Sequence, residues 1–212
     1  MARMNLISSE GVMTSNKEDG VRLVRPEDIK RLCEIYAYYV EDSEAVVSFE
    51  IVAPDFVEFK RRVVSISRNF PYIVYQESGT VLGFAYAHPC FERAAYRWSL
   101  ETTIYLAPDV RGRGVGRLLY SALIDLCREL GFRNLYAVIV KENAESCAFH
   151  ERIGFKEMAL FRSTGWKSGR WLDVVWYELQ IGTFDTPPGE PISISRLSTS
   201  AIDGIIKGVD RK

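Results

Sequence analysis

The stretch Ile104-Tyr-Leu-Ala-Pro-Asp-Val-Arg-Gly-Arg-Gly-Val-Gly-Arg-Leu-Leu-Tyr120 decides the fold of this chain. Here an apolar strand pattern breaks into a basic glycine loop that opens directly onto a helix. Gly112, Gly114 and Gly116 can take backbone angles that a Cβ would forbid, so several N–H groups can turn toward one oxyanion. The positive end of the helix that begins near Gly114 adds to this attraction. The stretch therefore predicts a phosphate-binding loop between a strand and a helix.

The charges and spacing of this loop favour a pyrophosphate. Guanidinium groups suit such a ligand, and the loop carries Arg111, Arg113 and Arg117. A Walker loop needs a Lys and a Ser or Thr after its last glycine, but Arg117 and Leu118 follow Gly116. The dinucleotide fingerprint spaces its glycines as G-x-G-x-x-G, whereas these glycines alternate. A tight turn beside solvated arginines remains the plainer alternative.

The composition is that of an ordinary globular protein. The chain has 212 residues, 47% of them hydrophobic, and a formal charge of −1, so it can bury a substantial core as one domain. This charge gives no electrostatic case for nucleic acid. The four cysteines are scattered, so we expect free thiols in a reducing compartment and no metal. No stretch approaches the ~20 apolar residues of a membrane span, and we expect a soluble, cytoplasmic protein that does not bind membranes.

The chain is organised as one core with a loose segment at each end. Residues 1–20 are polar and aperiodic, which predicts a flexible N-terminal segment. A Pro- and Gly-rich boundary near residue 181 separates a C-terminal tail, 181–212, in which a short helix is expected around 201–207. The core therefore spans 21–180.

Hydrophobic periodicity predicts a mixed α/β core between these segments. We expect mainly antiparallel strands, with parallel pairing after the helix that follows the glycine loop. The expected strands cover 21–24, 72–76, 81–88, 98–106, 135–140, 155–163 and 171–180. The expected helices begin near 26, cover 55–67, run from about 114 to Gly131, and cover 144–153.

Four motifs of the core resemble those of a known family. The segment Val21-Arg-Leu-Val-Arg-Pro-Glu-Asp28, the glycine loop, Asn143-Ala-Glu-Ser146 and His150-Glu-Arg-Ile-Gly-Phe155 are similar to the successive motifs of the GNAT superfamily of N-acetyltransferases. More narrowly, Ser48-Phe-Glu50 and Arg93-Ala-Ala-Tyr96 resemble phosphinothricin and methionine sulfoximine acetyltransferases. The resemblance covers roughly 21–180 and implies a GNAT-type α/β fold, a mixed, mainly antiparallel central sheet flanked by helices.

The resemblance implies that acetyl-CoA is a co-substrate. The central strand would hydrogen-bond the pantetheine and the glycine loop would hold the pyrophosphate, which is coherent because an amide-rich chain can add to a strand edge. An ordinary helix cap remains an alternative for Asn143 and Ser146. The implied cofactor-binding residues are Thr103, Ile104, Tyr105, Arg111, Gly112, Arg113, Gly114, Val115, Gly116, Asn143 and Ser146.

Two residues are candidates for acid–base catalysis. An α-amino group is largely protonated at pH 7, so its acetylation needs a base. Glu101 is the candidate because a charged side chain within an apolar and hydroxylic strand is costly unless exposed or paired. Alternatively it is solvated or pairs with Arg97. His150 occupies the position where many superfamily members carry a Tyr whose hydroxyl is placed to protonate the departing CoA thiolate. An imidazole can do the same, or it can serve a structural role. His88 is expected to be structural.

The subfamily resemblance also suggests how the acceptor is bound. An acceptor that resembles an amino acid carries a carboxylate, and Arg93 and Tyr96 lie on the loop expected to face it. Phe49 and Glu50 would supply an apolar wall and a contact to the amine. Surface loops also carry such residues without any role, and that alternative stays open. Phe91 stands where some relatives carry a basic residue, a departure at a position expected to affect the preferred acceptor.

The sequence therefore predicts an acetyl-CoA-dependent N-acetyltransferase. The expected partner is a small amino acid analogue of the phosphinothricin or methionine sulfoximine type, acetylated on its free amino group by direct attack. The alternatives are an acetyltransferase for peptide amino termini or polyamines, and a non-catalytic module that binds acyl-CoA. The resemblance also implies a homodimer, with the tryptophans mostly in the core or at the contact between subunits.

Overall fold

A computed structural model describes residues 19–41, 48–185 and 187–209 of the chain. Most of the predicted N-terminal segment, residues 1–18, lies outside the described residues. The strands are β1 (Gly20–Leu23), β2 (Tyr72–Glu77), β3 (Thr80–Pro89), β4 (Ser99–Leu106), β5 (Asn134–Val140), β6 (Lys156–Lys167) and β7 (Arg170–Gln180). The α-helices are α1 (Ile29–Glu41), α2 (Phe56–Ser67), α3 (Val115–Glu129), α4 (Ala144–Arg152) and α5 (Thr199–Val209). Short 3₁₀ turns cover Pro26–Asp28, Ala94–Tyr96, Pro108–Val110 and Ile194–Arg196.

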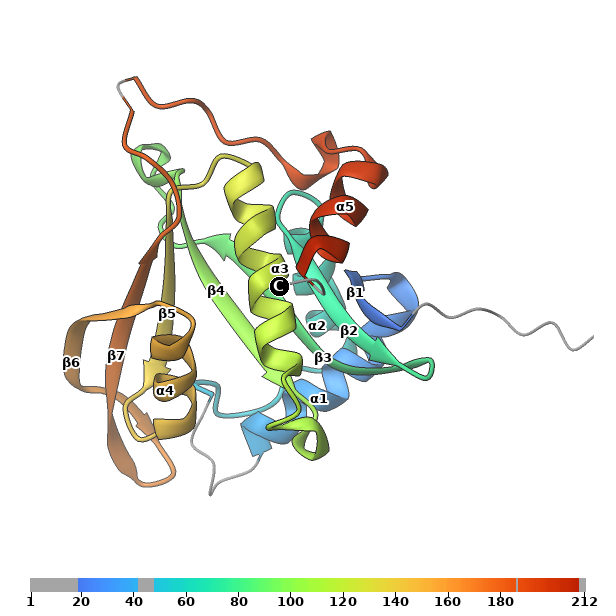
Figure 1. The fold of residues 1–212 in the computed structure, drawn as a ribbon. Coiled ribbons are helices and arrows are strands. Elements are labelled where there is room, and N and C mark those ends of the chain that lie inside the picture. The colour runs from blue at the N-terminus through green and yellow to red at the C-terminus, as the bar shows by residue number, and fades with distance from the viewer. Residues whose placement is uncertain (1–18, 42–47, 186, 210–212) are drawn as a thin grey trace, which may run out of the picture.

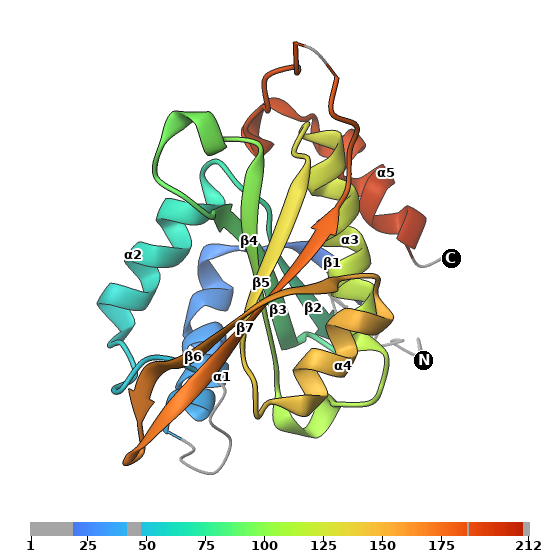
Figure 2. The ribbon, with the colours of Figure 1, turned by 90° about the vertical axis from the view of Figure 1, so that its left-hand side faces the viewer.

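The strands form one sheet in the order β1-β2-β3-β4-β5-β7-β6. Neighbouring strands are antiparallel except for β4 and β5, which are parallel because helix α3 connects them as a crossover. In Figures 1 and 2, α1 and α2 cover one face of the sheet, whereas α3, α4 and α5 cover the other. The predicted mixed, mainly antiparallel α/β fold is confirmed.

The alternating strand pattern divides the core between the two faces. Ile73, Ala85 and Leu100 pack with α3 in one cluster, while Tyr72 and Phe84 pack with α1 and α2 in the other. Because successive side chains of a strand point to opposite faces, the position of Leu100 fixes the faces of the residues that follow it in β4. Odd-numbered β4 positions from 101 to 105 therefore face α1 and α2, and Thr102 faces α3.

Residues 187–209 are not a loose end. In α5, Ile202, Ile206 and Val209 are buried in the same cluster as α3, and α5 lies beside α3 in Figure 1. The turn before α5 is also attached, because the Ile192 amide donates to the Leu130 carbonyl at 2.9 Å. The expected short helix is present, but the segment after residue 186 extends the core instead of hanging from it. An apolar stripe at positions i, i+4 and i+7 explains this packing.

Candidate active site

Strands β4 and β5 separate part-way along their length. They pair only at Ser99–Glu101 with Asn134–Tyr136, although β4 continues to Leu106 and β5 to Val140. On their outer sides, β4 stays paired with β3 and β5 stays paired with β7. The two facing edges beyond the fork therefore have no strand partner. The backbone amide and carbonyl of Ile104 lie beside this opening, where an amide-rich ligand can add as a strand, whereas those of Thr103 and Tyr105 point to β3.

Glu101 lies at this fork, on the face of the sheet that α1 and α2 cover. It is the last β4 residue paired with β5, and no hydrogen bond holds its carboxylate among the described residues. Burial raises its pKa above the usual range, and the charge of His88 opposes this rise. His88, which we expected to be structural, is the residue directly opposite Glu101 on β3. The alternative pairing of Glu101 with Arg97 is not found, because Arg97 pairs with Glu190 at 2.7 Å.

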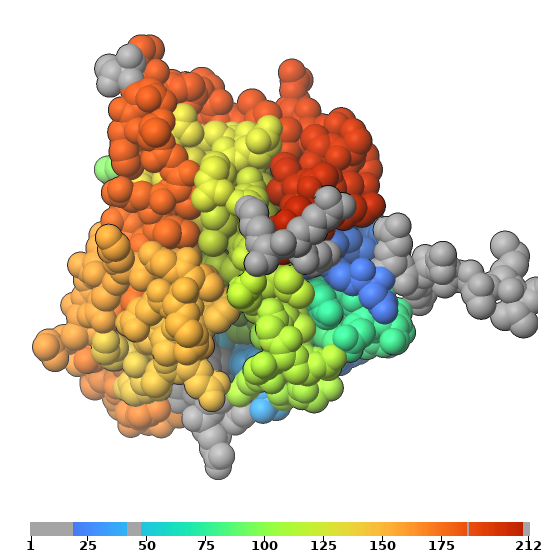
Figure 3. Space-filling view, in the orientation of Figure 1, coloured from blue at the N-terminus to red at the C-terminus, as the bar shows by residue number. Residues whose placement is uncertain are grey.

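The glycine loop has the backbone that its sequence predicted. Gly112 and Gly114 have φ angles of +77° and +82°, in the left-handed region that favours glycine, and Gly114 is the N-cap of α3. A Cβ on Gly116 would lie 3.3 Å from Phe149 of α4. The first amides of a helix have no intrahelical acceptor, so the start of α3 offers donors and a positive dipole end. Figure 3 shows the surface hollowed between this loop and α4.

Two of the three loop arginines, Arg111 and Arg113, already have partners within the protein. Arg111 donates to the Tyr39 hydroxyl at 3.2 Å, and its guanidinium carbon lies 5.3 Å from the centre of that ring. Arg113 forms an exposed ion pair with Glu77 at 2.6 Å. Both side chains remain at the mouth of the loop, where a phosphate could compete for their donors.

Asn143 caps helix α4, which was the alternative role expected for it. Its Oδ1 accepts from the Ser146 amide at 3.1 Å at the start of α4. Helix α4 lies on the same face of the sheet as α3, whose start carries the glycine loop (Figure 1). A cap and a contact to a cofactor are therefore compatible in this residue.

His150 is enclosed rather than exposed. The residue is 3% exposed, and its Nδ1 donates to the Ser146 carbonyl at 2.8 Å. Because a carbonyl only accepts, the neutral ring leaves Nε2 to accept from the Tyr120 hydroxyl at 2.8 Å. Tyr120 is also 3.1 Å from the Thr102 hydroxyl, which donates to the Tyr136 carbonyl at 3.0 Å. Burial lowers the pKa of His150 to about 4, so the ring is neutral at pH 7.

The hydroxyls of Tyr120 and Thr102 lie between His150 of α4 and the point where β4 and β5 separate. The bond from Thr102 to the Tyr136 carbonyl crosses from β4 to β5 immediately after their last paired residues. Tyr120 and Thr102 were absent from the predicted site. Only the position of Thr102, next to Glu101, could have indicated a role, since a buried Tyr in a leucine-rich helix gives no signal.

The predicted acceptor residues lie on two separate loops. Phe49 is 43% exposed, and Glu50 forms a close ion pair with Arg62 of α2. Arg93 is the N-cap of the 3₁₀ turn before β4, and exposed Tyr96 packs on Phe91 with ring centres 5.0 Å apart. Each pair is brought together locally, but no contact between the two loops is recorded among the described residues.

Two cavities lie near these loops. The larger, of about 220 Å³, is lined by the 95–99 segment, by Arg133 and Asn134, and by Thr183, Phe184, Asp185 and Pro188. The smaller, of about 100 Å³, lies under α1 and α2 on the face that carries Glu101, and it is lined by Tyr36, Arg62 and Tyr86, among others. These three residues were also missed from the sequence, because tyrosines and arginines on amphipathic elements are usually core or solvated residues.

Comparison with known proteins identifies the family. The family model described as an acetyltransferase (GNAT) domain matches residues 21–176. The chain belongs to the GNAT acetyltransferase family. Two GNAT relatives are a phosphinothricin N-acetyltransferase of Alcaligenes faecalis, 38% identical over 78% of this chain and 84% of that protein, and an L-methionine sulfoximine/L-methionine sulfone acetyltransferase of Salmonella typhimurium, 30% identical over 79% and 97%.

A solved GNAT structure supports the same assignment. The phosphinothricin acetyltransferase of Sinorhizobium meliloti in complex with AcCoA is 36% identical, with a TM-score of 0.77 over 84% of this chain and 97% of that chain. GNAT enzymes use acetyl-CoA, and the opening between β4 and β5 together with the glycine loop fits that co-substrate. None of the helices in the described residues has the length and hydropathy to cross a membrane.

Proposed function

We propose that this GNAT enzyme transfers the acetyl group of acetyl-CoA to the free amino group of a small amino acid analogue of the phosphinothricin or methionine sulfoximine type. The observation that carries the proposal is the carboxylate of Glu101, which is partly buried, has no hydrogen-bond partner among the described residues and lies at the fork of β4 and β5. The names of the relatives support this class of acceptor.

The two sides of the sheet supply the two substrates. Ile104 offers its backbone groups at the opening, and the amides from Gly112 to Gly116 bind the pyrophosphate on the α3 side. Acetyl-CoA supplies a thioester, whose carbonyl carbon is the electrophile. The acceptor enters from the α1 and α2 side, where Glu101 faces. Attack through the opening then needs no covalent acyl-enzyme.

Glu101 acts as the base. The α-amino group arrives mostly protonated, and a carboxylate with a raised pKa removes one proton so that the nitrogen lone pair can attack. The new C–N bond forms as the C–S bond breaks, the sulfur leaves with the electron pair, and the second proton lost by the nitrogen passes to the thiolate. His88, opposite Glu101, stabilises the ionised form of the base because its charge opposes the effect of burial.

His150 acts as a positioning residue in this proposal. Of the two roles expected for it, protonation of the CoA thiolate is disfavoured, because a buried neutral imidazole whose two nitrogens are occupied has no free proton to give. It can influence the reaction only through Tyr120 and Thr102. Its hydrogen bond with the Tyr120 hydroxyl holds that group 3.1 Å from the Thr102 hydroxyl, and Thr102 itself donates to the Tyr136 carbonyl where β4 and β5 separate.

The acceptor is held by the two loops on this side. Arg93 offers a guanidinium without a recorded partner among the described residues, which suits the carboxylate of an amino acid. Tyr96 and Phe49 supply aromatic surface, and Glu50 lies near enough to Tyr36 and Arg62 to fix the edge of the site.

An acceptor panel tests the proposal. Purified protein is mixed with acetyl-CoA and one amine at a time, and free CoA thiol is measured. We expect release with phosphinothricin, methionine sulfoximine or methionine sulfone, and weaker release with polyamines or peptide amino termini. If CoA thiol is released only with peptides or only with polyamines, the acceptor belongs to that class and not to the amino acid analogues. Binding of CoA without thiol release with any amine would make the chain a non-catalytic module.

We further propose that the enzyme is a homodimer. Phe49, Val52, Trp166 and Trp171 are exposed apolar residues, and the two tryptophan rings are 5.3 Å apart at the end of the β6–β7 hairpin. Phe49 lies next to this hairpin, since its ring is 3.8 Å from where a Cβ of Gly165 would be. Clustered apolar surface of this kind often marks a subunit contact. Light scattering of the purified protein should give twice the mass of the chain.

A cytoplasmic location completes the proposal. The cysteines Cys33, Cys90, Cys127 and Cys147 are all free, and Cys127 and Cys147 are buried. Free thiols are typical of a reducing compartment. Fractionation of the native host should place the protein with soluble cytoplasmic markers, and recovery with a secreted or membrane fraction would contradict this.

A further inference from the structure

The 100 Å³ cavity between α1, α2 and the sheet has a distinct lining. Its walls are aromatic and aliphatic, with one cation, Arg62 of α2, at the edge. One water needs about 10–15 Å³ of such volume, so the cavity has room for several atoms of a side chain. Its lining residues are Tyr36, Phe59, Arg62, Val63, Ile66, Tyr72, Phe84 and Tyr86.

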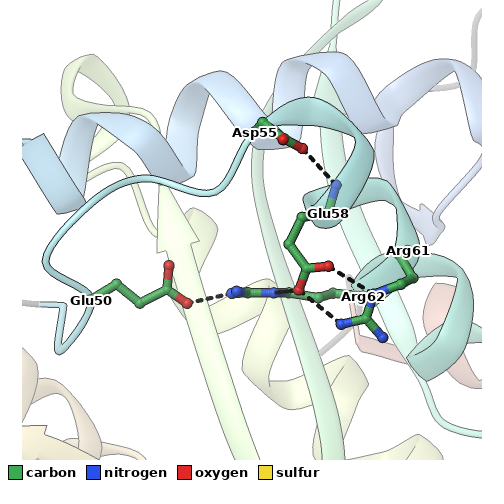
Figure 4. Close-up of polar contacts among 5 residues, drawn as sticks. All are labelled: Glu50, Asp55, Glu58, Arg61 and Arg62. Carbon is green, nitrogen blue, oxygen red and sulfur yellow. Dashed lines mark hydrogen bonds and ion pairs between the residues drawn. The ribbon is translucent and has the colours of Figure 1, made fainter.

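Two carboxylates hold Arg62 in place. Its Nε donates to Glu58 at 2.8 Å and its Nη1 donates to Glu50, as Figure 4 shows. Its Nη2 has no hydrogen-bond partner among the described residues. The neighbouring Arg61 also binds Glu58, at 2.7 Å, but its side chain is 69% exposed and does not line the cavity. Arg62 is therefore oriented in advance and retains donors for a ligand.

The polar groups of the cavity are all able to donate. Burial raises the pKa of Tyr36, raises that of Tyr72 well above its usual range, and raises that of Tyr86 to about 12. These hydroxyls keep their protons at neutral pH, and a guanidinium only donates. A side chain that ends in acceptor oxygens complements this set.

The cavity is connected to the base by one residue. Tyr86 lines the cavity and pairs with Thr103, while the next residue on the same face, His88, pairs with Glu101. The Tyr86 and His88 rings are 5.8 Å apart. An acceptor whose amine reaches Glu101 can thus extend its side chain past Tyr86 toward Arg62.

We propose that this cavity is the subsite for the acceptor's side chain, and that Arg62 selects side chains ending in oxygen acceptors such as sulfonyl, sulfoximine or phosphinate groups. The inference rests on the proposed function and names the residue that sets the preference for one substrate class. Glu50 then acts as a positioning residue for Arg62, in addition to any contact with the amine.

The test compares two acceptors of equal length. L-Methionine sulfone carries two sulfonyl oxygens that L-methionine lacks, so the ratio of their kcat/KM values reports recognition of those oxygens. We expect Arg62→Met to lower this ratio about tenfold or more, the size expected for one hydrogen bond to a charged group. Arg61→Met is the matched control, because Arg61 binds the same Glu58 without lining the cavity, and it should keep the wild-type ratio.

The outcomes separate the two proposals. A ratio for Arg62→Met within twofold of wild type, or an equal fall in Arg61→Met, overturns the role of Arg62. Absence of thiol release by the wild type with both acceptors overturns the proposed function itself. KM for acetyl-CoA and the melting temperature show whether Arg62→Met folds. If it does not fold, Arg62→Gln is measured instead, with the same ratio of kcat/KM values as the readout.

Discussion

Replacing His150 with glutamine should reduce the acid sensitivity of the fold. The ring is held neutral in the folded state, where burial lowers its pKa from 6.5 to about 4. In the unfolded chain the same group binds a proton near pH 6.5. Below that pH the unfolded state therefore binds more protons than the folded state, and stability falls. A glutamine side chain has no proton to bind in this range, so this part of the pH dependence should disappear.

The magnitude follows from the two pKa values. The difference between 6.5 and about 4 corresponds to about 3 kcal/mol, lost between neutral pH and pH values below 4. Integrated from pH 8 to pH 5, the loss is about 2 kcal/mol. At pH 8 the substitution should itself destabilise the protein, because removing the imidazole disturbs buried bonds to Tyr120 and to the Ser146 carbonyl, each worth about 1–3 kcal/mol if left unmade.

The assay is urea unfolding of both proteins at pH 8 and pH 5. The free energy of unfolding of the wild type should fall by about 2 kcal/mol more than that of His150→Gln between these pH values. Comparing the two differences cancels the contributions of the titratable groups that both proteins share. Equal losses in the two proteins would refute the assignment of His150 as a buried neutral residue.

Three further predictions concern the base, the loop and the acceptor. Glu101→Gln should lower kcat by about 10²–10⁴-fold and leave the affinity for acetyl-CoA unchanged. It should also remove the rise of kcat that the wild type shows as the pH passes the raised pKa of Glu101. A pH profile like that of the wild type would exclude Glu101 as the base. Gly114→Ala, at φ +82°, should cost about 1–2 kcal/mol and weaken acetyl-CoA binding, whereas the control Gly204→Ala within α5 should raise the melting temperature. Arg93→Ala should raise KM for the amino acid alone, and an equal rise in KM for acetyl-CoA would show that this loop does not bind the acceptor.

Local patterns in the sequence were enough to predict the elements of the fold. The turn at Ser78 and Gly79 has φ angles of +50° and +77°, as a tight hairpin requires, and the strands on either side follow their alternation. The glycine loop could be predicted because its backbone needs are met by residues adjacent in the sequence. The C-terminal helix was also visible, but its packing on α3 depends on a partner far away in the chain.

The parts of the site that depend on distant contacts could not be predicted. Strands β4 and β5 are far apart in the sequence because helix α3 lies between them. The point where their pairing ends is therefore a long-range feature, and no residue type marks it. In the sequence, His150 looked like an available acid. Its burial comes from residues of other elements, which the sequence of its own helix does not show. Arg61 and Arg62 are adjacent and alike in sequence, and only the approach of α2 to the sheet places Arg62 at a cavity. Sequence patterns thus located the glycine loop at the start of α3 but not the residues that line the smaller cavity.

Titration calorimetry with acetyl-CoA tests the central claim most directly. The opening between the two strands and the amides at the start of α3 predict one binding site per chain, with heat released or absorbed on mixing and a melting temperature that rises as the ligand is added. A titration that gives no heat at several temperatures, together with an unchanged melting temperature, would contradict the account of this site.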